Sequence, residues 1–314
     1  MQAAVVNVPG QAPKFQAFPD PEPTDGETVV QVRAVGLHPV VKAIASGAHY
    51  SSAASGPAIP GIDGVGTLKD GSRVYFGFVR KPWGTIAERA AAGKLIPLPD
   101  GLDDVTAAAI ANPGMSAWLT LKDRAELTHG EAVLIMGATG VAGQLAIQVA
   151  RHLGAKRVIA AGRNVDALAK ADVDGIIALN QTEEAIREAL IEEAVAGIDV
   201  VVDYLWGRPT ELVLEALAKG FRPEGSRKTR LVEVGESAGK TIALPGAVLR
   251  SIDLTLMGSG FGAVPLDGVL AAIPALFDLA AKKTLTIGVE PVAVADVEQA
   301  WNRVEKGRRI VFEL

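Results

Sequence analysis

Short apolar runs separated by turn residues characterise the first third of the chain. Examples are AAVV (3–6), TVVQVRAV (28–35) and SRVYFGFV (72–79), and the segments between them are rich in Pro and Gly. Runs of this length, bounded by turn residues, are typical of antiparallel strands. We therefore expect a compact, mainly-β domain up to about residue 108.

From Leu102 onward the pattern changes to alternating strands and helices. The Ala-rich stretch 103–125 is expected to be helical. Buried strands are then predicted at 131–137, 157–162, 175–179, 198–205 and 229–235, and amphipathic helices at 141–154, 165–171, 183–195 and 209–220. Strands that alternate with helices predict a parallel sheet covered on both faces. The expected fold class is α/β, with a doubly wound parallel sheet (Rossmann) domain.

The C-terminal part continues this pattern and then departs from it. A sixth strand is expected at 254–260, followed by a helix at 265–283, a strand near 289–294, a helix at 295–306 and a last strand at 308–314. The last strand is expected to return to the N-terminal β domain. The predicted domains are therefore 110–260, which binds a dinucleotide, and a discontinuous domain made of 1–109 and 261–314.

Composition narrows the possible classes of protein. The 314 residues include no cysteine, so a disulfide, a catalytic thiol and a Cys-based zinc site are excluded. The net charge is −5 and the basic residues are scattered, which argues against a nucleic-acid partner. No apolar run is long enough to span a membrane, and residues 1–15 lack the pattern of a signal peptide. We expect a cytoplasmic protein that acts on a small-molecule substrate.

The strongest motif is the glycine-rich turn in EAVLIMGATGVAGQLAIQVARHLGA. It lies between a buried strand and an amphipathic helix, where backbone N–H groups and the helix dipole favour a phosphate. Its spacing is Gly-x-x-Gly-x-x-Gly, which departs from the strict Gly-x-Gly-x-x-Gly. The alternative is a turn without a ligand. The residues expected to contact a cofactor pyrophosphate are Gly137, Ala138, Thr139, Gly140, Val141, Ala142 and Gly143.

The end of the next strand indicates which nicotinamide cofactor is used. An Asp or Glu at this position usually holds a free ribose 2′-hydroxyl. Here the strand ends in Gly162, Arg163 and Asn164, and the first carboxylate is Asp166 in the following helix. The planar cation of Arg163 suits a 2′-phosphate, although it is also compatible with an ordinary surface arginine. NADPH is therefore the expected cofactor.

Taken in order, these motifs resemble the medium-chain dehydrogenase/reductase superfamily, specifically its zinc-independent quinone oxidoreductase branch. The resemblance covers almost the whole chain and includes VRAVGLHP, PGIDGVG, WGTIAERAAA, ANPGMSAW, the glycine turn and LMGSGFG. It implies a GroES-like fold for the discontinuous domain. It also implies a homodimer that transfers hydride from NADPH to a quinone or to an activated C=C bond, such as that of an enone or alkenal.

The residues at the superfamily's zinc positions differ from the metal-binding pattern. Where zinc-dependent members have a Cys and a Gly-His-Glu, this chain has His38 and Gly61-Ile62-Asp63, so no metal is expected. The Asn-x-x-Asp-x-Tyr segment of quinone reductases is replaced by residues 38–43. His38, Lys42 and Tyr50 are the polar side chains left as candidate catalytic groups. They can instead be surface residues, with solvent as the proton source.

The resemblance implies further contacts with the nicotinamide side of the cofactor. These residues are Ser116, Tyr204, Leu205, Val234, Gly235, Gly258, Ser259, Gly260 and Phe261. Asp203 matches a family position, or it is a carboxylate that anchors a loop. Two functional alternatives remain open: a stand-alone enoyl-thioester reductase of a biosynthetic pathway, and a non-enzymatic NADPH-binding redox sensor. A short-chain reductase is excluded because no Tyr-x-x-x-Lys pair occurs.

Overall fold

The computed structural model describes residues 1–48, 52, 56–220, 228–304 and 307–314. They form two compact units. Unit 1 consists of Met1–Asn112 and Ile273–Leu314, and unit 2 is Pro113–Ala272. Tyr50, one of the candidate catalytic residues, lies outside the described residues. In the described ranges, no helix has the length and apolar character needed to cross a membrane.

Unit 2 is built around a six-stranded sheet in which all neighbouring strands are parallel. The strands are β8 (Ala132–Met136), β9 (Arg157–Gly162), β10 (Gly175–Ala178), β11 (Val200–Asp203), β12 (Thr229–Glu233) and β13 (Leu254–Gly258). Their order is β10-β9-β8-β11-β12-β13, which confirms the predicted doubly wound sheet. The strand order reverses between β8 and β11, and ligands of such sheets bind at this switch point, beyond the carboxyl ends of the strands.

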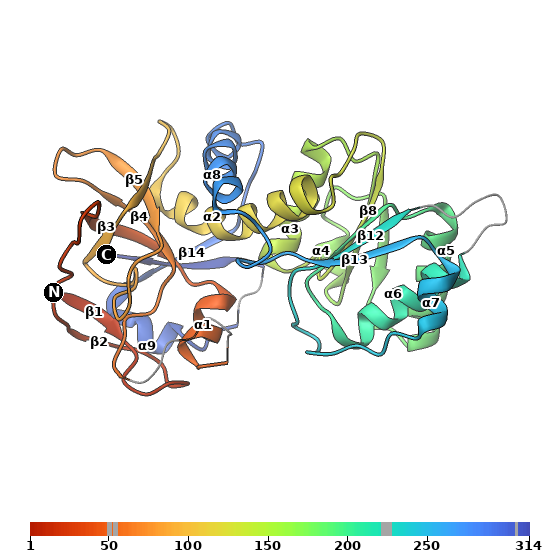
Figure 1. Cartoon of the computed structure of the whole chain (residues 1–314), viewed down its shortest axis with the longest axis horizontal. Helices are drawn as coiled ribbons and strands as arrows, with labels where there is room; N and C mark the ends of the chain where they lie inside the picture. Colours follow the sequence, from red (N-terminus) through yellow and green to blue (C-terminus); the bar gives the residue numbers. More distant parts are fainter. Residues whose placement is uncertain (49–51, 53–55, 221–227, 305–306) are drawn as a thin grey trace. The chain divides into compact units, whose positions relative to one another are not determined.

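Helices cover both faces of the parallel sheet. They are α3 (Val141–His152), α4 (Val165–Leu168), α5 (Glu183–Ala196), α6 (Gly207–Lys219) and α7 (Gly246–Ser251). The helix α6 contacts both α5 and α7 on one face of the sheet (Figure 1). The right-handed rule for strand crossovers places α3 and α4 on the other face. Every residue of β8, AVLIM, is buried, as expected for a central parallel strand.

Unit 1 contains the mainly-β part of the chain. Its strands are β1 (Gln2–Val5), β2 (Lys14–Ala17), β3 (Thr28–Gly36), β4 (Asp63–Thr67), β5 (Arg73–Gly77), β6 (Arg89–Ala92), β7 (Lys94–Pro97), β14 (Val289–Ala293) and β15 (Arg309–Glu313). The last strand, β15, pairs antiparallel with β3, so the C-terminal strand returns as predicted (Figure 1). Val35, Phe76 and Phe312 lie in the core that these strands enclose.

The remaining helices are α1 (Pro39–Ala45), α2 (Asp104–Trp118), a π-helix (Leu119–Arg124), α8 (Leu266–Ala281) and α9 (Val297–Ala300). The helix predicted at 295–306 was too long. A single 3₁₀ turn at Val294–Asp296 leads into α9, which ends at Ala300. Trp301 and Asn302 form a turn directly after it, which ends the helix.

Candidate functional site

The glycine turn connects β8 to α3 at the carboxyl end of the central strand. Gly137 has a φ of +83°, a conformation that favours glycine. The N–H groups of Gly137 and Ala138 both donate to the carbonyl oxygen of Ala161, at 2.9 and 3.0 Å, which holds the turn against β9. Gly140 then caps α3 with an extended backbone. The first N–H groups of α3 have no acceptor within the helix and point out of its N-terminus.

Two close approaches explain why this turn requires small residues. A Cβ on Gly143 would lie 2.4 Å from the carbonyl oxygen of Gly137 and 2.6 Å from Cα of Ala138. A Cβ on Gly162 would lie 2.9 Å from Cγ2 of Thr139. The turn therefore packs directly on α3 and β9, leaving an open backbone cradle at the helix N-terminus. A cradle of this kind fits a cofactor pyrophosphate.

At the end of β9, two predicted cofactor residues have different surroundings. The side chain of Asn164 accepts a hydrogen bond from the N–H of Ala167 at 3.1 Å and thereby caps α4. Arg163 is exposed, and its guanidinium has no ion-pair partner among the described residues. Arg163 is thus available to a ligand, whereas Asn164 already has a structural role.

Asp203 organises the loop that follows β11. It is fully buried, and one of its carboxylate oxygens accepts from the N–H groups of Leu205 and Trp206, at 2.9 and 3.1 Å. The hydroxyl of Thr210 donates to the other oxygen. Burial raises the pKa of Asp203, and these hydrogen bonds oppose the rise. Of the two readings of Asp203 from the sequence, the loop anchor is the one confirmed.

The same loop holds Trp206 in a strained backbone conformation. Its φ of 54° and ψ of −165° fall in a region that glycine alone adopts readily, and occupancy by another residue costs about 1–3 kcal/mol. The next residue, Gly207, approaches the loop after β12 so closely that a Cβ would lie 2.9 Å from the Ala238 oxygen. The N–H of Ala238 in turn donates to Leu205 at 2.7 Å. These contacts fix the backbone that carries the Trp206 side chain.

Backbone hydrogen bonds also connect the carboxyl ends of β11, β12 and β13 in the parallel sheet. The N–H groups of Val234 and Gly235 donate to the carbonyl oxygen of Asp203, at 2.8 and 3.2 Å. The N–H of Ser259 donates to the carbonyl oxygen of Glu233 at 2.8 Å. Three of the residues implied by the family resemblance, Val234, Gly235 and Ser259, therefore belong to one connected edge.

Side chains from the π-helix reinforce the loop after β13. The Thr120 hydroxyl donates to Oγ of Ser259 at 2.9 Å, and Nε of Arg124 donates to the Gly258 oxygen at 2.9 Å. Gly260 and Phe261 follow on the exposed side, where Phe261 has 44% of its surface accessible. The loop is thus held at its start, while Phe261 is free to contact a ligand.

Tyr204 carries a buried hydroxyl at this edge of the sheet. Among the described residues, that hydroxyl has no hydrogen-bond partner of ordinary geometry. Burial raises the pKa of Tyr204 well above its usual range, and the nearby Ser116 side chain offsets a small part of this rise. A phenol with a raised pKa stays protonated, and this hydroxyl has almost no surface open to a ligand.

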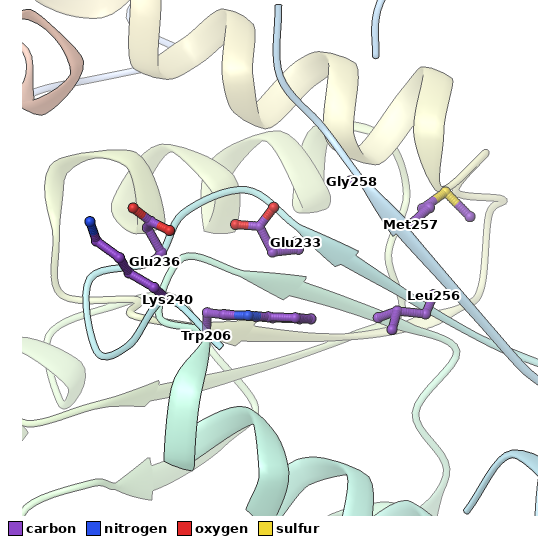
Figure 2. Close-up of a pocket in the computed structure, with 7 residues that line it drawn as sticks. All are labelled: Trp206, Glu233, Glu236, Lys240, Leu256, Met257 and Gly258. Atoms are coloured by element: carbon purple, nitrogen blue, oxygen red, sulfur yellow. The ribbon is translucent and has the colours of Figure 1, made fainter. Parts of the chain in front are cut away.

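A pocket of about 390 Å³ opens at the carboxyl ends of β12 and β13 (Figure 2). The residues that line it are Trp206, Glu233, Glu236, Lys240, Leu256, Met257 and Gly258. Burial, together with the charges of Asp203 and Glu236, raises the pKa of the half-buried Glu233. Sequence reasoning missed both glutamates and Lys240. The available signal was the position of Glu233 at the end of a predicted strand.

In unit 1, His38 lies in the core, which neither interpretation of its role anticipated. It is fully buried, and its Nε2 lies 3.2 Å from Oδ1 of Asp63. The buried Tyr75 hydroxyl donates to Oδ2 of Asp63 at 3.0 Å. His38 thus presents no surface to a cleft. Lys42 is half-buried, and its amine donates to the Arg303 oxygen at 3.4 Å.

Metal-binding side chains do not gather in the part of the chain that the structure describes. No group of three or more His, Cys, Asp or Glu residues there could hold a metal ion. Of the residues matched to the superfamily's zinc-binding segments, His38 and Asp63 contact each other, and Ile62 has no metal-binding atom in its side chain.

Comparison with characterised sequences shows relatives along the whole chain, although no family model matches it. An Emericella nidulans protein with the name "Probable NADPH-dependent quinone reductase" is 28% identical over 99% of both chains. The quinone oxidoreductase of Sus scrofa is 31% identical over 74% of both chains.

Similarity extends to much larger proteins. The spectinabilin polyketide synthase system protein NorB of Streptomyces orinoci is 34% identical over 88% of this chain. The alignment covers 12% of that protein, so the chain matches only a short part of the synthase.

Solved structures share the fold over the full length. A mycobacterial quinone oxidoreductase superimposes with a TM-score of 0.83 at 21% identity, which shows the fold alone. The quinone oxidoreductase of Thermus thermophilus, solved also in complex with NADPH, has a TM-score of 0.77 at 31% identity and covers 100% of both chains. The chain therefore belongs to the quinone oxidoreductase-like branch of the medium-chain dehydrogenase/reductase superfamily.

Proposed function

We propose that this protein is a zinc-independent oxidoreductase that transfers hydride from NADPH to a quinone or to an activated C=C bond. The observation that carries this proposal is the backbone cradle of residues 137–143, which lies at the switch point of the parallel sheet. The Emericella nidulans relative, which is named as NADPH-dependent, and the Thermus thermophilus structure in complex with NADPH support the same cofactor.

Each part of the edge described above has a role in this proposal. Residues 137–143 would bind the pyrophosphate and Arg163 the 2′-phosphate. Tyr204, Leu205, Val234, Gly235, Ser116 and residues 258–261 would line the nicotinamide side. Bound NADPH supplies the hydride, while the protein orients it and excludes water. Because His38 lies in the core, the proton would come from solvent, Lys42 or Tyr50.

Zinc independence is part of the proposal and follows from the available side chains. The sequence has no cysteine, so His38 stands where the superfamily has its Cys ligand, and Ile62 stands where it has its His ligand. We further propose a homodimer in the cytoplasm, with unit 1 as the GroES-like substrate domain. Sedimentation at several protein concentrations tests the homodimer.

A substrate panel tests the reaction. Purified protein is mixed with NADPH and, in turn, quinones, alkenals and enones, and cofactor oxidation is followed by its absorbance. We expect turnover with at least one of these classes, unchanged by a chelator and lower with NADH. Loss of turnover with the chelator would contradict zinc independence. Tight NADPH binding without oxidation by any substrate would favour the redox-sensor alternative.

A second candidate function is the reduction of an enoyl thioester. The similarity to polyketide synthases favours it, because these are biosynthetic proteins. Enoyl thioesters are therefore included in the same panel. A kcat/KM for enoyl thioesters far above that for quinones and free enones would assign the protein to this second function.

A further inference from the structure

The pocket in Figure 2 belongs to one half of the proposed cofactor site. The glycine turn follows β8 and marks the position of the pyrophosphate. From there β9 and β10 extend to one side, with Arg163, and β11, β12 and β13 extend to the other. A doubly wound sheet binds one nucleotide half on each side of the switch point. Since Glu233 and Gly258 end β12 and β13, the pocket lies on the nicotinamide side.

This pocket carries an excess of negative charge. Two carboxylates, Glu233 and Glu236, line it together with one amine, that of Lys240. Neither carboxylate has an ion-pair partner within 4 Å among the described residues. Asp203 lies close enough to raise the pKa of Glu233, so a third carboxyl group adds to the negative potential. The half-buried position of Glu233 weakens screening by solvent.

The Trp206 ring provides an aromatic surface for the same space. Figure 2 shows both glutamates on one side of this ring, with Lys240 beyond Glu236. The Asp203 hydrogen bond to the N–H of Trp206 anchors the backbone that carries this indole. An aromatic face combined with carboxylates attracts a positively charged group. The pocket is therefore suited to a flat cation.

We infer that Glu233 and Glu236 make this pocket selective for the oxidised, positively charged nicotinamide ring over the neutral reduced ring. The inference rests on the proposed function. In that reaction a C–H bond of the reduced ring breaks and its electron pair leaves with the hydrogen. The substrate gains this hydride and a proton, which comes from solvent or from a side chain that solvent re-protonates, and the ring becomes cationic. Stabilising the cationic product makes bound NADPH a stronger hydride donor.

The test compares the dissociation constants of NADP⁺ and NADPH in single variants. We expect Glu233→Gln and Glu236→Gln each to raise the ratio Kd(NADP⁺)/Kd(NADPH) roughly three- to tenfold, as a single charge interaction across a partly solvated pocket would. Lys240→Met removes a positive charge and should lower the ratio. Glu188→Gln, at an exposed position of α5 outside the pocket, is the matched control and should leave the ratio unchanged. Both constants are measured by titration calorimetry, on variants whose melting temperature matches that of the wild type.

The outcomes separate this inference from the proposed function. If the wild-type protein binds neither form, the cofactor assignment fails and the inference falls with it. If the wild type binds both forms but the glutamine variants leave the ratio unchanged, only the inference is overturned. A ratio that moves in the same direction for Lys240→Met as for the glutamine variants would also overturn it, because charge would not be the cause.

Discussion

Replacing Gly143 or Gly140 with alanine separates the two roles of the glycine turn. A Cβ at Gly143 would lie 2.4 Å from the Gly137 oxygen and 2.6 Å from Cα of Ala138, both backbone atoms that cannot rotate away. Overpacking of this kind costs about 1–3 kcal/mol, and alanine regains up to about 1 kcal/mol as a better helix former. We expect a net destabilisation of about 1–2 kcal/mol and a melting temperature roughly 2–8 °C lower.

Gly140→Ala should behave differently. The nearest atom to a Cβ there is the Gly137 oxygen at 3.4 Å, and the φ of −72° is open to alanine. Stability should change by less than about 1 kcal/mol. The added methyl group occupies the exposed mouth of the cradle, so a phosphate should lose one of its backbone hydrogen bonds. A bond to a charged group contributes about 1.5–3 kcal/mol, which corresponds to a loss of NADPH affinity of about ten- to a hundredfold.

The assay is a thermal melt and an NADPH titration of each variant beside the wild type. The account requires that Gly143→Ala lowers both the melting temperature and the affinity, whereas Gly140→Ala lowers the affinity alone. Wild-type affinity in Gly140→Ala would show that the pyrophosphate does not bind at this turn. An unchanged melting temperature in Gly143→Ala would show that α3 does not pack closely on the turn.

Three further outcomes are expected. Arg163→Ala should weaken NADPH binding about tenfold and leave NADH binding unchanged in the same titration. The reason is that Arg163 has no other ion-pair partner among the described residues. Equal losses of affinity for both cofactors would place the 2′-phosphate elsewhere. Tyr75→Phe should lower the free energy of unfolding by about 1–3 kcal/mol in denaturant titrations at neutral pH, because the buried carboxylate of Asp63 loses its hydroxyl donor. An unchanged free energy of unfolding would mean that this hydrogen bond contributes nothing to stability. Burial and the charge of Asp63 raise the pKa of Tyr75 above 10.0. Above pH 10 the folded protein therefore keeps a proton on Tyr75 that the unfolded chain has lost, so the free energy of unfolding falls as the pH rises. The free energy of unfolding should fall by about 1.4 kcal/mol per pH unit in the wild type and less steeply in Tyr75→Phe. Tyr204 contributes equally to both proteins. Identical slopes in the two proteins would contradict the raised pKa of Tyr75.

The elements of unit 2 were predictable because their signal is local and repeated. Buried strands such as β8, with every residue apolar, alternate with helices of regular period, and this alternation permits few sheet topologies. The glycine spacing likewise reflects sterics within seven residues, 137–143, as the contact of Gly143 with Gly137 shows. The cofactor contacts assigned to these residues stay predictions until binding is measured.

The charged pocket was not predictable from local pattern. Trp206 follows β11, whereas Glu233 ends β12 and Glu236 follows it, and only the parallel pairing of these two strands brings the residues together. The burial of His38 has a similar cause. Its polar character favoured a site in a cleft, but its pairing with Asp63 depends on the way β3, β4 and α1 pack, which sequence spacing does not encode.

The most direct test of hydride transfer follows the transferred atom itself. An enone or alkenal that the protein reduces is incubated with NADPH deuterated at the reactive carbon of the nicotinamide ring, in ordinary water and with a chelator present. We expect one deuterium per turnover on a carbon of the product, with the second hydrogen coming from solvent. Oxidation of NADPH that leaves no deuterium in the product would contradict it.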